Sequence, residues 1–271
     1  MKINNYQKVC LIFLLGLVAF WLALFLSHTT SGFYNYLYSF LFGLIPLIGG
    51  ITAMVNSKIW GRFQSSMGKA TFFTGLGIFL WGAGEAIWSY YNFFKGIPAP
   101  YPSLADLGFA PSIFFYGLGA VYLSQATGAK FGFRSNYAKL FVAIALILIL
   151  DISYYILIIV ARGGVLVPQG ETLLKGILDI AYPLGDFLSL TLGVIISGLS
   201  FKYFGGRFKY DVISLLLGLG VMFVADSVFS YTTTIGTYYN ANWGDLLLTL
   251  GMFLITFGVL GFHRSKEHLA A

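Results

Sequence analysis

The sequence is short of charge, cysteine and histidine. Only 10% of its 271 residues are Asp, Glu, Lys or Arg, whereas a soluble globular domain carries about 25%. Its single cysteine, Cys10, excludes an internal disulfide and a cysteine metal cluster. The three histidines, His28, His263 and His268, lie outside the apolar segments, so we expect no histidine metal centre, haem site or other cofactor there. These absences exclude a soluble single-core domain, a disordered tail and a disulfide scaffold.

The sequence instead contains long apolar segments. It is 58% hydrophobic and 18% aromatic, with a mean hydropathy of +0.82. A membrane helix needs about 20 mostly apolar residues to cross about 30 Å of hydrocarbon. We therefore predict a single all-α integral-membrane domain over residues 1–271, a polytopic helical bundle with eight transmembrane helices. The predicted helices are about 9–26, 37–55, 70–94, 104–126, 138–160, 183–202, 211–232 and 243–262.

The basic residues predict the orientation of these helices. If the N-terminus is inside the cell, the inner segments hold 13 of the 16 Lys and Arg residues, and only Lys95, Arg162 and Lys175 lie outside. Because basic residues accumulate on the cytoplasmic side, we predict a multi-pass protein of the cell (plasma) membrane with both termini cytoplasmic. These bases then serve topology and contacts with the lipid bilayer, and we expect no nucleic-acid partner.

Two stretches of the sequence resemble each other. In each, an acid late in one helix is followed by an aromatic-Ser-Tyr sequence, and a second acid begins the next helix. A weaker third copy has its tyrosines closer to the first acid. Helices three to eight are therefore predicted to form three parallel helical-hairpin repeats. The corresponding residues are Glu85, Trp88, Tyr90 and Asp106, then Asp226, Phe229, Tyr231 and Asp245, and in the weaker copy Asp151, Tyr154, Tyr155 and Asp186.

Three of these acids lie deep within the predicted helices. An ionised acid in hydrocarbon costs at least about 2.5–3.5 kcal/mol, so Glu85, Asp151 and Asp226 are expected to face the bundle interior. We predict that they converge on one outward-facing, partly wet cavity and bind a ligand or cation. We make no prediction about a metal. The expected aromatic lining is Trp88, Tyr90, Tyr154, Tyr155, Phe229 and Tyr231.

The other three acids are predicted at helix starts. Residues 103–106 (Ser-Leu-Ala-Asp) and 242–245 (Asn-Trp-Gly-Asp) match a capping box, in which an N-cap side chain and an acid three residues later satisfy each other's backbone N–H groups. A proline three residues before Asp186 is typical of a first helical position and would place Asp186 in a first turn. Asp106, Asp186 and Asp245 are therefore interpreted as helix caps or as secondary binding residues.

One part of the chain resembles a known class of membrane region. The pattern Trp88–Tyr91, Tyr101–Asp106 and Pro111 is similar to multi-span regions that precede histidine-kinase, PAS or diguanylate-cyclase modules in prokaryotic sensors. The similarity covers about residues 81–122. It implies a sensory or ligand-binding membrane module. No such module follows the last predicted helix in this sequence, so any output would come from the protein alone or from a cytoplasmic or membrane signalling partner.

Three functions remain open from the sequence. The first is a non-enzymatic sensor or binding protein with an outer acidic and aromatic pocket, which would suit a small cationic or aromatic ligand. The second is a cation- or proton-coupled transporter or channel that uses the same acids. The third, a lipid-modifying enzyme, is the least favoured because no nucleophile–base pair is visible. The inner halves of the helices are almost wholly apolar, which favours a pocket that opens on one side only.

Overall fold

The structure is a computed structural model that describes residues 3–126, 136–165, 167, 170, 172–200 and 208–263. Every regular element in those residues is a helix. The long helices are α1 (Asn5–Leu26), α2 (Phe33–Asn56), α3 (Ser66–Tyr90), α4 (Asp106–Ala126), α5 (Asn136–Tyr154), α6 (Leu173–Ser200), α7 (Lys209–Thr234) and α8 (Trp243–Gly261). Short 3₁₀ or π-helical segments are η1 (Ser57–Trp60), η2 (Arg62–Gln64), η3 (Tyr91–Lys95) and η4 (Tyr155–Val160). The all-α prediction is thus confirmed, and the described residues contain eight long helices.

Six of these helices are long and apolar enough to cross a membrane. They are α1, α2, α3, α4, α7 and α8, of which α2 and α3 are extended by η1 and η3. Their exposed side chains suit lipid; Val9 and Ile12 on α1, for example, are 68% and 70% exposed. The protein therefore has the helices of a multi-pass membrane protein.

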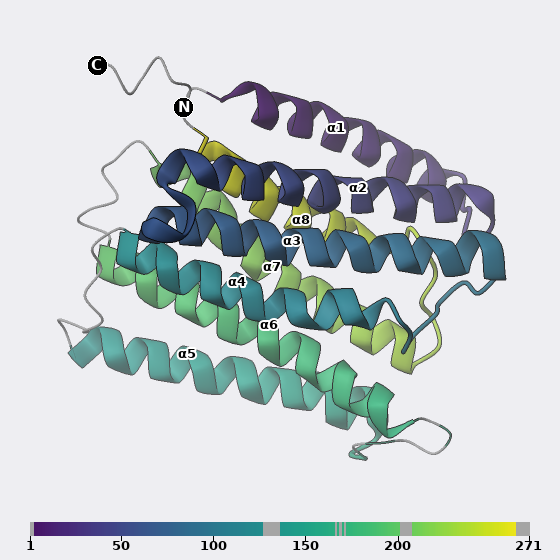
Figure 1. Ribbon diagram of the computed structural model, residues 1–271. Helices are drawn as coiled ribbons and strands as arrows, with labels where there is room; N and C mark the ends of the chain where they lie inside the picture. The colour runs from purple at the N-terminus through teal and green to yellow at the C-terminus, as the bar shows by residue number, and fades with distance from the viewer. Residues whose placement is uncertain are drawn as a thin grey trace.

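The helices lie roughly parallel or antiparallel to one another in a single bundle (Figure 1). The start of α1 and the end of α8 lie at one end, which we call the terminal end. The connections α1–α2, α3–α4, α5–α6 and α7–α8 lie at the other, the hairpin end. Helix α3 packs on α2 and α4, and α7 on α6 and α8, while α5 is peripheral and contacts α6.

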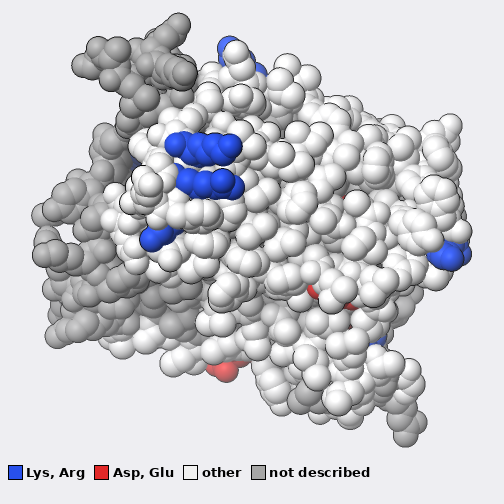
Figure 2. Space-filling view, viewed as in Figure 1, with Lys and Arg blue, Asp and Glu red and all other residues white. Residues whose placement is uncertain are grey.

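Charge on the surface is confined mainly to the two ends of the bundle. On the face seen in Figure 2, Lys and Arg gather near the terminal end, a smaller basic patch lies at the hairpin end, and few charged side chains lie between them. Lys58 and Arg62 are exposed in the α2–α3 connection, and Lys95 is exposed after α3. This distribution matches a belt of apolar surface that faces hydrocarbon.

Glycines bring the central helices into backbone contact. A Cβ atom on Gly108 of α4 would lie 2.6 Å from the backbone nitrogen of Gly84 in α3, directly beside Glu85. Nearer the terminal end, a Cβ on Gly50 of α2 would lie 2.6 Å from the carbonyl oxygen of Gly75 in α3. Such small-residue contacts are typical of membrane helices, because they let helices pack closely without a hydrophobic driving force.

Helix α6 begins earlier than the sequence predicts. It starts at Leu173, and Pro183 lies inside it, so the predicted start at residue 183 was wrong and Asp186 does not lie in a first turn. The Asp186 side chain lies outside the described residues. A membrane helix tolerates an internal proline, because neighbouring groups can satisfy the freed backbone. The charges of Lys175 and Asp179 interrupt the apolar pattern in the first turns of α6, which explains why those turns were missed.

Candidate functional site

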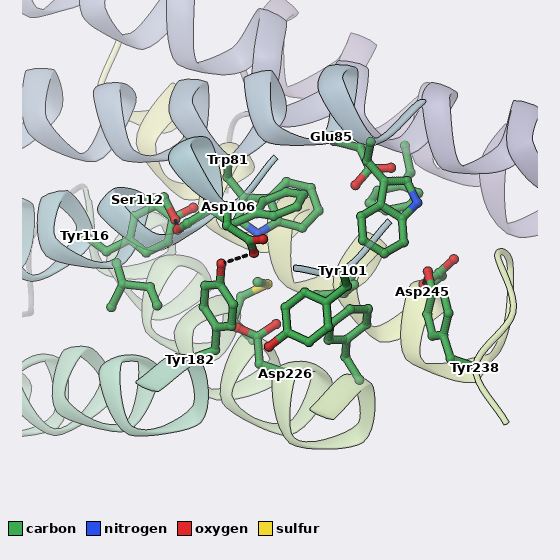
Figure 3. Close-up of a pocket in the computed structure, with 17 residues that line it drawn as sticks. Trp81, Glu85, Tyr101, Asp106, Ser112, Tyr116, Tyr182, Asp226, Tyr238 and Asp245 are labelled. Carbon is green, nitrogen blue, oxygen red and sulfur yellow. Dashed lines mark hydrogen bonds between the residues drawn. The ribbon is translucent and has the colours of Figure 1, made fainter. Parts of the chain in front are cut away.

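A cavity lies among α2, α3, α4, α6, α7 and α8 (Figure 3). Its volume is about 40 Å³, measured as the space open to the centre of a water-sized sphere. Since about 10–15 Å³ of that measure holds one water, the cavity has room for a few waters or for part of a small ligand. The lining comprises nine aromatic residues, four acids, and Ser112, Ile113, Met222 and Leu248. The aromatic residues are Phe42, Trp81, Trp88, Tyr101, Phe109, Tyr116, Tyr182, Phe229 and Tyr238, and the acids are Glu85, Asp106, Asp226 and Asp245.

Glu85 enters the cavity from α3 and is only 4% exposed. Its Oε1 accepts a hydrogen bond of 2.9 Å from Ser39 Oγ on α2. Among the described residues, no donor is found for its Oε2. Gly43 gives the side chain room, because a Cβ there would lie 2.5 Å from Glu85 Cγ. One carboxylate oxygen of a buried acid is therefore left for a ligand.

Asn240, in the α7–α8 connection, fixes the neighbours of Glu85. Its Oδ1 accepts from Trp88 Nε1 at 2.9 Å and lies 3.2 Å from Ser39 Oγ, whose single proton it shares with Glu85 Oε1. Its Nδ2 donates to the carbonyl oxygen of Pro98 in the α3–α4 connection at 2.6 Å. One buried amide therefore ties together α2, α3 and two connections at the hairpin end, and it sets the position of the Trp88 ring. Sequence reasoning missed this residue.

Asp245 both caps α8 and lines the cavity. Its backbone N–H donates to Asn242 Oδ1 at 3.1 Å, and its Oδ2 accepts from the Ala241 N–H at 2.6 Å. The Tyr238 hydroxyl donates to its Oδ1 at 3.1 Å. Burial, and then the charges of Asp245 and Glu85, raise the pKa of Tyr238 well above its usual value, so this hydroxyl stays protonated as a donor.

Asp106 plays the same double role at the start of α4. Its Oδ2 accepts from the Ser103 N–H at 2.7 Å, and Ser103 Oγ accepts from the Ala105 N–H at 3.1 Å. The Tyr182 hydroxyl on α6 donates to Asp106 Oδ1 at 2.5 Å. Asp226 on α7 lies near the same hydroxyl and acts on it electrostatically. The two interpretations of these helix-start acids, cap and cavity lining, therefore coexist at Asp106 and Asp245.

A buried ion pair lies behind Tyr101. The Tyr101 hydroxyl donates to Asp179 Oδ1 at 2.7 Å. Asp179 Oδ2 pairs with Arg162 and accepts from Lys175 Nζ at 3.1 Å. The side chains of Arg162 and Asp179 are fully buried. Burial and the charge of Asp179 raise the pKa of Tyr101, so it too remains a donor. The sequence analysis assigned no role to this pair, because both residues lie between the predicted helices 138–160 and 183–202.

Three rings meet nearly at right angles beside Glu85. Trp88 contacts Phe229 and Tyr238 with centroid distances of 5.9 Å each and interplanar angles of 66° and 86°. Phe229 and Tyr238 are 5.1 Å apart at 76°. Tyr101 continues the cluster, 5.1 Å from Phe229. Ring faces next to carboxylates form a suitable environment for an ammonium group.

The structure brings part of the predicted site together. Glu85, Asp226 and Trp88 line one cavity with Asp106 and Asp245. The corresponding acids of the first two predicted repeats therefore share a site, although they come from helices distant in the sequence.

The remaining predicted residues lie elsewhere. Asp151 is exposed on α5, as are Tyr154 and Tyr155 at 58% and 60%, and none of them lines the cavity. The expectation that all three deep acids converge is therefore not met. The reason is that α5 packs on the outside of α6, so an acid at the equivalent position of this hairpin faces outward. Tyr90 is 48% exposed and stacks on Phe94, and Tyr231 is partly buried outside the cavity lining.

The cavity acids are not arranged as a metal centre. Within the described part of the chain, no group of three or more His, Cys, Asp or Glu side chains is placed to hold a metal ion. Comparison with protein-family models, curated proteins and solved structures finds no match for this chain. The fold and cavity therefore define a class only: an all-α, multi-pass membrane-type bundle with an acidic and aromatic cavity.

Proposed function

We propose that this is an integral membrane sensory or ligand-binding protein whose cavity takes a small organic cation. The observation that supports this most strongly is the buried Glu85 carboxylate, one oxygen of which has no donor among the residues that the structure describes. Four acids line the cavity, and none of the described lining residues is basic. Buried carboxylates need a counter-charge or a proton, and a cationic ligand supplies the former.

An organic cation fits this cavity better than a metal ion does. The carboxylates are distributed around the cavity and do not converge on one point, as the absence of a three-ligand group in the described residues indicates. A metal ion needs several oxygen ligands at close range, whereas an ammonium group needs one or two acceptors and gains from ring faces. Trp88, Phe229 and Tyr238 supply those faces.

The packing supports access from one side, and hence sensing over transport. The backbone contact at Gly50 and Gly75 closes α2 against α3 on the way to the terminal end. On the terminal-end side of the cavity, Tyr116 on α4 donates to the Met252 sulfur on α8 at 3.7 Å. A transporter must expose its site to both sides in turn. We keep a cation- or proton-coupled transporter or channel as the second candidate, because an incompletely bonded intramembrane acid is also what proton coupling requires.

Catalysis on lipid is the least supported function. Ser112 is a possible nucleophile in the cavity, but its hydroxyl donates to the Phe109 carbonyl at 2.6 Å. None of the described lining residues is a histidine or lysine that could act as its base.

The proposed orientation places the hairpin end outside the cell and both termini in the cytoplasm. It rests on the 13 of 16 basic residues that would then lie inside. The proposal includes eight membrane crossings, although α5 and α6 are not among the six helices that meet the length and hydropathy criteria. With this orientation the cavity faces the outer side, and any signalling partner would contact the cytoplasmic or membrane-embedded surface.

A thermal-shift screen in detergent tests this function. Simple alkylammonium salts should raise the melting temperature of the wild type, because a ligand that binds only the folded state stabilises it. Glu85→Gln should abolish the rise. Asp151→Asn is the matched control, since it removes one acid from a helix outside the cavity and should keep the rise. An equal shift in Glu85→Gln and in the wild type would contradict the proposal.

A further inference from the structure

The hydroxyl groups that line the cavity already donate to acceptors other than Glu85. Among the described lining residues these hydroxyls belong to Tyr101, Ser112, Tyr116, Tyr182 and Tyr238, and each has its own acceptor. The indole N–H of Trp88 likewise donates to Asn240 Oδ1. Since a hydroxyl or an indole nitrogen has a single proton to donate, these groups have none left for Glu85.

The carboxylates of the cavity differ in how fully they are hydrogen-bonded. Asp106 and Asp245 each accept from a backbone N–H at one oxygen and from a tyrosine hydroxyl at the other. Glu85 accepts at Oε1 from Ser39, and its Oε2 has no donor in the part of the chain that the structure describes. Because Glu85 is only 4% exposed and lines the cavity, this oxygen needs a donor from whatever occupies the cavity.

Close packing on two sides holds Glu85 in place. On the α2 side, a Cβ atom at Gly43 would lie 2.5 Å from Glu85 Cγ. On the α4 side, a Cβ at Gly108 would lie 2.6 Å from the backbone nitrogen of Gly84, the residue before Glu85. The carboxylate is therefore a fixed acceptor, and the donor has to come to it.

The space beside Glu85 suits a compact cationic group with N–H donors. The cavity volume of about 40 Å³ corresponds to about three waters on the same measure. The rings of Trp88, Phe229 and Tyr238 provide an apolar surface for a small substituent. A quaternary ammonium presents only carbon to Glu85, so it would remove water from Oε2 without replacing the hydrogen bond.

We propose that the cavity selects a singly charged ammonium group that carries N–H donors, typically a primary ammonium, and discriminates against quaternary ammonium, with an N–H donated to Glu85 Oε2. This inference rests on the proposed function, since it specifies the class of organic cation that the cavity binds. The hydrogen bond to Oε2 is charge-assisted on both sides, which makes it stronger than a bond between neutral groups. The ring faces attract either kind of cation, so the discrimination comes from Glu85.

Isothermal titration of the whole protein in detergent tests the inference with matched probes. Tert-butylammonium and tetramethylammonium have the same branched shape and the same charge, but only the first has N–H groups. Tert-butylammonium should bind at least about tenfold more tightly, which is the lower range for a hydrogen bond to a charged group. A smaller pair, isopropylammonium and trimethylsulfonium, repeats the comparison and decides the matter should neither larger probe bind.

Variants assign the discrimination to Glu85. Glu85→Gln should weaken the binding of every ammonium probe and bring the two members of a pair to similar affinities. Glu85→Asp keeps the charge but withdraws the carboxylate, so it should reduce the preference within a pair and retain cation binding. Asp151→Asn, outside the cavity, should keep the wild-type preference. If Glu85→Gln does not fold, the Glu85→Asp comparison takes its place.

The outcomes distinguish this inference from the function beneath it. In the wild type, equal or tighter binding of the member without N–H groups would overturn the N–H requirement and leave the organic-cation site standing. A full wild-type preference in the Glu85 variants would overturn the assignment to Glu85. Failure of every probe to bind the wild type would overturn both the inference and the proposed function.

Discussion

Glu85 is the residue on which the proposed site depends, and its contacts explain how a buried acid is held. It is stabilised by one hydroxyl donor, Ser39, and by space that only a glycine leaves at position 43. Its nearest charged neighbours in the cavity are acids. A carboxylate in this setting is incompletely compensated, as is common for intramembrane acids with a function.

Gly43→Ala should therefore disturb the site directly. The added Cβ would lie 2.5 Å from Glu85 Cγ and 2.9 Å from its Cβ, so Glu85 or α2 must shift. We expect a loss of about 1–3 kcal/mol in unfolding free energy, as for other overpacked sites, together with weaker ammonium binding. Gly16→Ala is the control, because no atom lies within 4 Å of the added Cβ. That change should be neutral or should stabilise α1 by up to about 1 kcal/mol. Denaturant titration measures both, and equal effects would contradict the packing argument.

His263 should give stability a pH dependence at the terminal end. Burial lowers the pKa of His263 below its ordinary value of 6.5. Its Nδ1 is buried without a partner among the described residues, and its ring packs on Tyr6 at 4.9 Å. Between the lowered pKa and 6.5 the unfolded chain binds more protons than the folded one, so stability rises with pH across this window and falls on acidification.

The measurement is the melting temperature between about pH 5 and 8. His263→Gln should flatten this part of the profile, and His28→Gln, at an exposed position in the α1–α2 connection, should leave it as in the wild type. A profile in which His263→Gln retains the full acid destabilisation would assign that destabilisation to other groups.

The cost of burying an acid in hydrocarbon predicted some cavity residues, but it was wrong for Asp151, which is exposed on α5. An acid within an apolar helix is expensive, and that argument found Glu85 and Asp226. It could not find Asn240 or Tyr238, because their roles depend on how the α7–α8 connection folds against residues far away in the sequence. The bond from Trp88 to Asn240, for example, spans 152 positions.

At the scale of single elements, helix starts carry both stability and the site. Each of the α4 and α8 starts makes one half of the predicted capping box: Asp106 accepts from the Ser103 N–H, and Asn242 accepts from the Asp245 N–H. The other halves differ, because Ser103 Oγ accepts from the Ala105 N–H and Asp245 from the Ala241 N–H. Both acids line the cavity.

The start of α6 was placed ten residues too late, since its first turns contain Lys175 and Asp179. Those charges are compatible with a buried helix start because Asp179 pairs both with Lys175 and with Arg162. A hydropathy pattern cannot reveal such a partner.

The Arg162–Asp179 pair should be important for holding the α5–α6 hairpin on the bundle. Arg162 also donates to the Leu157 carbonyl at 2.8 Å and to Thr234 Oγ1 on α7 at 3.1 Å. Removing one partner of a buried pair leaves an uncompensated charge. Arg162→Leu should therefore destabilise the protein by up to about 5 kcal/mol, with Lys175 limiting the loss.

Lys95→Leu is the matched control, because Lys95 is exposed at the same end of the bundle and should change stability by no more than about 0.5 kcal/mol. The double variant Arg162→Leu/Asp179→Leu should recover part of the loss. Similar stability of Arg162→Leu and Lys95→Leu would show that the pair contributes nothing.

At the scale of the whole molecule, the long apolar segments predicted the helices. A short connection places the two helices of each hairpin beside each other in the bundle. What the sequence could not predict is which helices surround the cavity. Position in the hairpin pattern suggested that all three hairpins contribute equivalent acids, yet Asp151 on α5 faces outward. The α5–α6 hairpin, which contains Asp151, instead supplies Tyr182 to the cavity and Asp179 behind it.

The overall topology predicts different labelling at the two ends. Thr237→Cys and Gln64→Cys place probes at exposed positions in the α7–α8 and α2–α3 connections, at the hairpin and terminal ends respectively. A membrane-impermeant thiol reagent added to intact cells should label the first and miss the second, whereas both should react after permeabilisation. The native Cys10 is buried, so labelling of the wild type measures the background reaction of this cysteine. Labelling of Gln64→Cys in intact cells would reverse the proposed orientation.

The most direct test of the central claim is an experimental structure of the protein with a brominated alkylammonium bound. We predict density for the ligand in the cavity, with its ammonium within hydrogen-bonding distance of Glu85 Oε2 and beside the rings of Trp88, Phe229 and Tyr238. An occupied ligand site elsewhere on the molecule, with this cavity filled only by water at saturating ligand, would contradict the account.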